Sequence, residues 1–143
     1  MKNLLFVLIL FYSQESYAQP DSVNFYKECF ERHLNKYHKG KVRNIFLQET
    51  AGITDEISEN IFGISIIKLD DSRVRNRVKK GSFVMLQIFP IVIKNNEIKL
   101  EIVEFSVLFK DGKTNLVRHG GSSYTIGFSD GKYKITDEYH QGI

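Results

Sequence analysis

Cys29 and His33 are four positions apart, the spacing that places a thiol and an imidazole on the same face of a helix. A nucleophilic Cys–His pair needs a thiol with a lowered pKa, which a helix N-terminus or a nearby cation commonly supplies. Cys29 falls in the middle of its expected helix, where the backbone amides are already bonded. We therefore interpret Cys29 as a buried and inert core residue, because free cysteines are among the most buried residue types.

The histidines do not form a ligand pattern along the sequence. Cys29 and His33 offer two donors, and two ligands do not make a zinc site. The remaining histidines are His38, His119 and His140, and they show no ligand spacing. We therefore expect no metal site and no cofactor.

Three short strings resemble catalytic or phosphate-binding motifs, but each lacks the context that the motif requires. Ser65 and Lys68 have the Ser-x-x-Lys spacing, yet they lie in an expected strand rather than at a helix start. Gly112-Lys113-Thr114 follows a hairpin turn instead of opening a helix. His119-Gly120-Gly121 has no nucleophile elbow to accompany it. We expect no catalytic residue among them.

Glu104 and His119 are the candidates for a polar group in a pocket, and Glu101 is a further acid–base candidate. The strand pattern changes phase near Glu104, and one of the two phases would point its carboxylate inward. Burial would then raise the pKa of that carboxylate and mark a pocket. The alternative is a solvated glutamate at a bulge, which is commoner because Glu is rarely buried without a partner.

The segment 73–80 is the one local charge cluster. It holds five basic residues in eight: Arg73, Arg75, Arg77, Lys79 and Lys80. Asp70-Asp71-Ser72 before it and Gly81 after it favour a helix, whereas an extended segment would align four of the cations on one face. Most charge runs are solvated surface, and the alternative is a binding surface for an anionic envelope component or a protein partner. No aromatic residues alternate with the cations, so we expect no nucleic-acid partner.

The elements that position these residues follow from the apolar pattern. Apolar and aromatic residues recur at three- and four-residue steps over 21–37, which predicts an amphipathic helix with Asp21 as N-cap and Gly40 as stop. Residues 52–60 are compatible with one or two helical turns. Residues 64–69 have the composition of a strand.

The second half of the chain is rich in strands. Residues 82–94 and 97–109 flank Asn95-Asn96, which predicts a long hairpin. Two Asp-Gly turns predict further strands, which we place over 115–119, 124–128 and 133–136. The phase change predicts a bulge or a sharp twist near 102–104, and Pro90 is expected at an edge or beside that irregularity.

This order of elements predicts an α+β fold. An N-terminal amphipathic helix would pack on a curved antiparallel β-sheet meander, as in cystatin-like or NTF2-like cone-sheet architectures. The length of 143 residues favours a single domain. The net charge of +3 is too small for a dedicated nucleic-acid binder. The single cysteine excludes an internal disulfide.

The N-terminus has the composition of a secretory leader. Lys2 precedes an apolar run over 4–12, and the small residues Ser16 and Ala18 predict a signal peptide over 1–18 that is cleaved after Ala18. The run is too short to span a bilayer, which needs about 20 residues. We therefore expect a secreted or periplasmic domain over 19–143, with no transmembrane segment after cleavage.

Most of the expected mature chain, including the hairpin around Phe89-Pro90, also carries a family resemblance. Gly120-Gly121-Ser122, Phe128, Lys132-Tyr133 and the closing Gly142-Ile143 together resemble a family of small secreted bacterial α+β proteins. The resemblance brings no activity and no site residue with it.

The leading hypothesis is therefore a secreted, non-catalytic binding or accessory domain. One alternative is a small cone-fold enzyme or ligand-holding protein with a pocket between helix and sheet. The other is a structural subunit of a cell-envelope assembly, joined through an exposed sheet edge.

Overall fold

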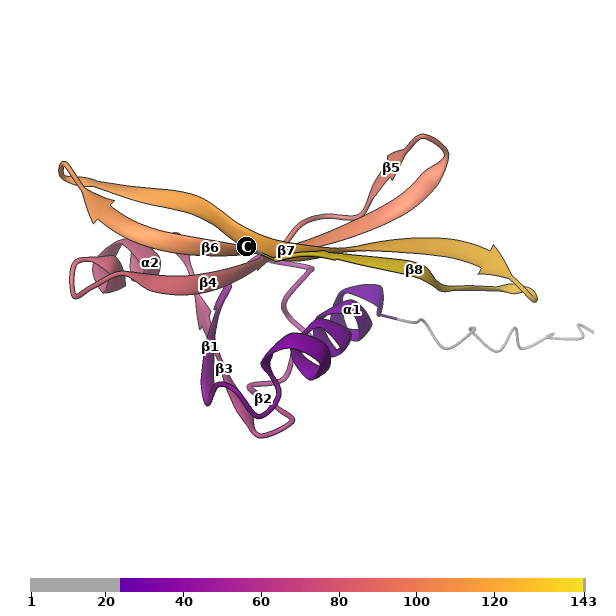
Figure 1. Cartoon of the computed structure of the whole chain (residues 1–143), viewed down its shortest axis with the longest axis horizontal. Coiled ribbons are helices and arrows are strands. Elements are labelled where there is room, and N and C mark those ends of the chain that lie inside the picture. The colour runs from indigo at the N-terminus through magenta and orange to yellow at the C-terminus, as the bar shows by residue number, and fades with distance from the viewer. Residues whose placement is uncertain (1–23, 143) are drawn as a thin grey trace, which may run out of the picture.

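The computed structural model describes residues 24–142 (Figure 1). The predicted signal peptide, its cleavage after Ala18 and the predicted N-cap Asp21 lie outside these residues. In the described part of the chain, no helix is both long enough and apolar enough to cross a membrane.

Two helical segments and eight strands make up the fold, with a π-helical turn after the first helix. The elements are α1 (Phe25–His33), η1 (Leu34–His38), β1 (Asn44–Gln48), β2 (Asn60–Ile61), β3 (Ile64–Leu69), α2 (Asp71–Val78), β4 (Phe83–Ile88), β5 (Val92–Lys94), β6 (Glu97–Lys110), β7 (Lys113–Ser129) and β8 (Lys132–Gln141). They confirm the α+β class and the packing of the N-terminal helix on a sheet. The strand order is β2-β3-β1-β4-β6-β7-β8, and β5 pairs with β6.

The prediction of a purely antiparallel meander is wrong for the first part of the sheet. Strand β1 pairs in parallel with both β3 and β4. Parallel strands need crossover connections, and α2 lies in the one between β3 and β4, which flank β1. The strands after β4 are antiparallel, as predicted.

Each face of the sheet packs against one helix. On one face, Leu86 and Ile102 belong to the core that includes Phe30 of α1. Their neighbours of opposite parity, including Met85 and Val107, belong to a second core with Val74 and Val78 of α2. Because side chains alternate across a strand, α1 and α2 cover opposite faces.

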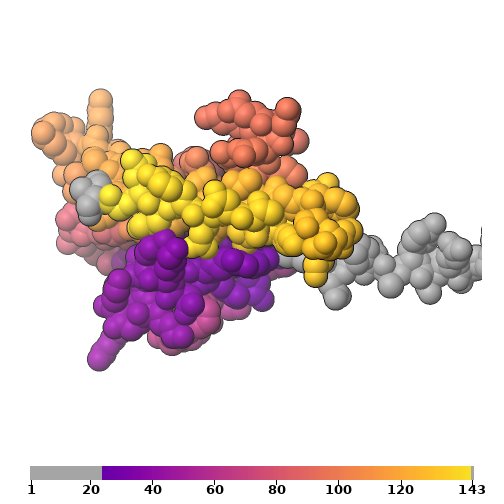
Figure 2. Space-filling view, turned by 45° about the vertical axis from the view of Figure 1, so that its right-hand side comes forward, coloured from indigo at the N-terminus to yellow at the C-terminus, as the bar shows by residue number. Residues whose placement is uncertain are grey.

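Helix α1 begins at the side chain of Asn24, which accepts a hydrogen bond from the amide of Lys27. The helix and η1 lie against the C-terminal strand β8, as Figure 2 shows for the indigo and yellow parts of the surface. An ion pair joins Lys36 to Glu138 across this contact. The helical segment is therefore held against the C-terminal half of β8.

The turns and the bulge were predictable, but some strand ends were not. Asn95 and Asn96 have positive φ angles, as the predicted hairpin requires. The register shift lies between Glu104 and Phe105, next to the predicted bulge. The predicted strands 115–119 and 124–128 are one continuous strand, β7, and residues 52–59 form turns and irregular loop rather than helix. The predicted strand 82–94 is interrupted at Pro90, which lies between β4 and β5.

Residues 73–78 lie in α2 and residues 79–80 in the turn after it, so the extended alternative is wrong. Asp70 caps α2 by accepting a hydrogen bond from the amide of Arg73 at 2.8 Å. Val74 and Val78 lie one turn apart and are both buried. The basic side chains consequently surround the exposed part of the helix.

Candidate metal centre

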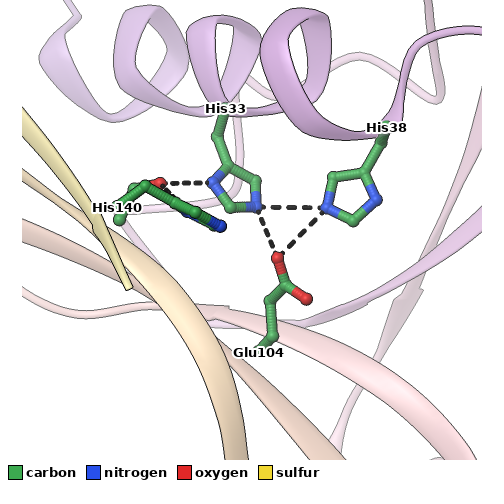
Figure 3. Close-up of polar contacts among 5 residues, drawn as sticks. His33, His38, Glu104 and His140 are labelled. Carbon is green, nitrogen blue, oxygen red and sulfur yellow. Dashed lines mark hydrogen bonds and ion pairs between the residues drawn. The ribbon is translucent and has the colours of Figure 1, made fainter. Parts of the chain in front are cut away.

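Three side chains from separate elements converge on one point between helix and sheet. His33 ends α1, His38 ends η1, and Glu104 lies in β6 just before the bulge. Nε2 of His33 lies 3.2 Å from Nε2 of His38 and 3.2 Å from Oε1 of Glu104. Nε2 of His38 lies 3.3 Å from the same carboxylate oxygen. Figure 3 shows both imidazoles extending from the helical segment toward the carboxylate.

The π-helical turn η1 brings the two histidines together. Residues five apart on an α-helix point about 140° away from each other, because each residue turns the helix by about 100°. In η1 the amide of Lys39 donates to the carbonyl of Leu34, which is the i to i+5 bond of a π-helix. This wider turn places His38 beside His33. The premise that His38 has no ligand spacing is therefore wrong.

Glu104 points inward, so the solvated-glutamate alternative is wrong. Its side chain is only 12% exposed and contacts both imidazoles. The expected rise in its pKa is also wrong. Hydrogen bonding to His33, then to His38, holds the pKa of Glu104 well below its usual range, and these effects outweigh its partial burial.

His33 is fully buried, and its surroundings favour the neutral imidazole. Burial lowers the pKa of His33, and this effect is larger than the opposing one of its hydrogen bond with Glu104. The pair is therefore a carboxylate beside a neutral imidazole. A neutral imidazole is the form that binds a metal ion.

Without a cation, both Nε2 atoms can carry hydrogens and donate to the one carboxylate oxygen of Glu104 that lies near both of them. If only one of the two Nε2 atoms of His33 and His38 carries a hydrogen, the lone pair of the other faces a carboxylate lone pair of Glu104. A cation between the three atoms would instead accept a lone pair from each one.

A second layer of side chains orients His33. Its Nδ1 lies 2.8 Å from Oγ of Ser122, and this hydroxyl lies 3.1 Å from Nδ1 of His140. The ring of His140 stacks on Tyr37 with 3.6 Å between ring centroids. The hydrogen bond at Nδ1 fixes the rotation of the His33 ring, so that Nε2 faces Glu104. Histidine ligands of metals are commonly held in this way.

The order Ser122, His33 and Glu104 also resembles a serine nucleophile with its base and orienting acid. Ser122 is only 5% exposed, and its hydroxyl is bonded to two histidines. A substrate carbonyl would have no access to that oxygen. The geometry therefore favours metal ligation over nucleophilic catalysis.

The other predicted site residues lie elsewhere. His119 is exposed at the bulge and lines a separate cavity of about 290 Å³ with Arg118 and Gln141. Glu101 is exposed on β6. The cluster Arg73, Arg75, Arg77, Lys79 and Lys80 lies on and just after α2. The triad differs from every predicted set, and only Glu104 had been singled out for a site.

Comparisons of the chain with protein-family models, curated proteins and solved structures found no match. The function is therefore inferred from the geometry of the site itself.

Cys29 should behave as an inert thiol. It is fully buried, and burial raises the pKa of its thiol to about 12. We expect labelling by a thiol reagent to be slow in the native protein and fast in denaturant. An absorbance assay measures the rate of labelling. Rapid labelling of the native protein would contradict this assignment.

The metal-free protein should lose stability on acidification. The pKa of His33 is lowered from its ordinary value of 6.5, so below that pH the unfolded chain binds a proton that the folded chain excludes. Stability then falls with decreasing pH, by at most about 1.4 kcal/mol per pH unit for this group. The lowered pKa of Glu104 adds a loss below about pH 4.5 for the same reason.

Urea unfolding between pH 8 and pH 5, with a chelator present, measures this loss. The variant His33→Gln should weaken the pH dependence, whereas His119→Gln, at an exposed position, should leave it unchanged. Stability that stays constant or rises over this range would contradict the assignment.

Proposed function

We propose that this protein is a secreted, non-catalytic metal-binding domain that holds a divalent transition-metal ion, zinc above all, on His33, His38 and Glu104. The observation that carries the proposal is the triangle of Nε2, Nε2 and Oε1 with edges of 3.2, 3.2 and 3.3 Å. Bonds of about 2.0–2.1 Å to a tetrahedral zinc ion place neighbouring ligand atoms about 3.3–3.4 Å apart. The observed distances between the ligand atoms differ from these values by only about 0.1–0.2 Å, so small side-chain movements suffice to ligate the ion.

The donor set favours zinc over other common ions. Magnesium and calcium prefer oxygen ligands, so two imidazoles count against both. Two histidines and a carboxylate occur in catalytic zinc sites and also in iron(II) oxygenases. The distances between the ligand atoms match a tetrahedral zinc ion. Comparing the affinities of the protein for zinc and for iron(II) would separate the two kinds of site.

Three protein ligands leave a coordination position open. Among the described residues, no fourth His, Cys, Asp or Glu joins this group. His38 and Glu104 are 16% and 12% exposed, so water reaches that edge of the triangle. A small enzyme with a zinc-bound water is the alternative function, and the donor set is the observation that favours it.

A titration of the metal-free mature chain tests the proposal. Isothermal titration with zinc should show one site per chain, and cobalt(II) should give the intense visible absorption of a tetrahedral complex. His38→Ala and Glu104→Ala should each abolish the site. His119→Ala removes an exposed histidine and should leave it intact. Binding that is absent in the parent, or that survives both ligand substitutions, would overturn the proposal.

Ser122 should act as a positioning residue for the metal ligand. Its hydroxyl is the partner of His33 Nδ1 at 2.8 Å. Loss of such a partner typically weakens metal affinity by about 10–100-fold. We expect this loss in Ser122→Ala and a partial rescue in Ser122→Thr, measured by competition with a zinc-binding dye. Equal affinities of Ser122→Ala and the parent would contradict the role.

Two finer assignments belong to the same proposal. One is the periplasmic or extracellular location, which rests on the sequence over 1–18. The other is a cystatin-like or NTF2-like architecture, which the packing of α1 against the long antiparallel strand β6 supports. The parallel pairs of β1 count against that architecture. Intact mass of exported protein would test the first assignment, since cleavage leaves Gln19 at the N-terminus.

A further inference from the structure

Helix α2 divides the basic cluster between two sides. Arg75 and Lys79 line a groove between α2 and the turn of the β6–β7 hairpin. Arg73, Arg77 and Lys80 line a different cavity, over β1 and β3. The five cations therefore do not form one surface.

Two of the cations outside the groove already have partners. The guanidinium of Arg77 lies 4.0 Å from the ring centroid of Phe46 and 5.1 Å from that of Phe83. Arg73 forms an ion pair with Asp70 at 3.4 Å. Packing and helix capping account for these two residues, so they need no ligand.

The groove brings three cations together from two elements. Arg75 and Lys79 are one helical turn apart, and Lys113 joins them from the start of β7. Within residues 24–142, no carboxylate forms an ion pair with any of the three. The groove has a volume of about 600 Å³. Positive charge on both sides of such a groove favours an anionic group.

The other residues that line the groove supply a carboxylate and apolar surface. Asp71 accepts a hydrogen bond from the amide of Gln48 at 2.7 Å, and both residues line the groove. This carboxylate lies at the start of α2, about 12 Å along the helix from Lys79. The exposed side chains of Phe109 and Leu116 add apolar surface. The groove thus offers an acceptor at one end, cations at the other end and apolar contacts along its length.

We infer that this groove binds an anionic saccharide. Its carboxylate or phosphate would lie among Arg75, Lys79 and Lys113. Its hydroxyls would donate to Asp71, and one face of the sugar ring would pack on Phe109 and Leu116. This inference is independent of the metal centre, because the two sites share no residue.

Nuclear magnetic resonance titration of the mature chain tests the inference, because it measures weak affinities and maps the site. The probes are digalacturonate and glucose 6-phosphate, with neutral glucose and inorganic phosphate as comparisons. We expect either acidic saccharide to shift the amides of α2 and the β6–β7 turn. Raising the salt concentration from 0.1 M to 1 M should weaken this binding, since the Debye length falls from about 10 Å to about 3 Å.

A matched pair of double variants distinguishes binding in the groove from general attraction to the positive charge of α2. Arg75→Gln with Lys79→Gln should weaken binding by at least about tenfold, since two charged contacts are lost. Arg73→Gln with Lys80→Gln removes the same charge from the other side of α2 and should stay within about twofold of the parent. Equal weakening by both pairs would overturn the inference. So would the absence of binding by both acidic saccharides, or binding of inorganic phosphate as tight as that of glucose 6-phosphate.

Discussion

Saturating zinc should raise the midpoint of thermal unfolding of the mature chain by about 12–16 °C. A ligand at 1,000 times its dissociation constant stabilises the folded state by about 4.1 kcal/mol. For a domain of this size, each kcal/mol corresponds to about 3–4 °C. Differential scanning calorimetry of the metal-free protein, with and without zinc, measures the shift.

The same experiment identifies the ligands. Glu104→Gln keeps the size of the side chain but replaces the carboxylate oxygen that lies 3.2 Å from His33. We expect this variant to lose most of the zinc-dependent shift. His119→Gln should retain all of it, because His119 is exposed and outside the triad. Equal shifts in the two variants would rule out the assigned centre.

Gly121→Ala should destabilise the protein by at least about 3 kcal/mol, or prevent folding altogether. Gly121 has a φ angle of +154°, and an added Cβ would lie 2.3 Å from the backbone oxygen of Ile102 and 3.1 Å from Cα of Val103. Backbone atoms of a central strand cannot move aside as a flexible side chain can. Urea unfolding of the variant and the parent measures the loss.

Gly112→Ala is the matched control for backbone strain. Gly112 also has a positive φ, +74°, but an added Cβ would meet nothing within 4 Å. Only the strain of a left-handed alanine remains, which costs about 1–2 kcal/mol. If the two variants were equally stable, the close approach of β6 and β7 at Gly121 would not be the cause of the stability lost in Gly121→Ala.

Sequence reasoning succeeded where local chemistry decides the structure. Asp70 and Gly81 flank a helix because a carboxylate can cap its first turn and a glycine accepts the backbone that follows. Asn95 and Asn96 form a hairpin turn for a similarly local reason. These features depend on a few neighbouring residues, so the sequence alone predicts them.

The candidate centre depended on contacts that no local pattern contains. The apolar stripe of 21–37 predicts an α-helix, and nothing in it indicates the change to a π-helix at Leu34. Without that change, His38 has no reason to meet His33. The phase change near Glu104 left an inward carboxylate as one of two alternatives, and its partners are 66 or more residues away in sequence. Only tertiary packing brings them together.

The span of sequence enclosed by the candidate centre has a consequence for chain entropy. An ion shared by His38 and Glu104 would join positions 66 residues apart. In the loop-closure model, a permanent cross-link over that distance restricts the unfolded chain by about 4 kcal/mol at 25 °C. The single cysteine excludes such a link by an internal disulfide. The metal would supply a reversible cross-link instead, one that depends on metal supply rather than on the redox state of the compartment.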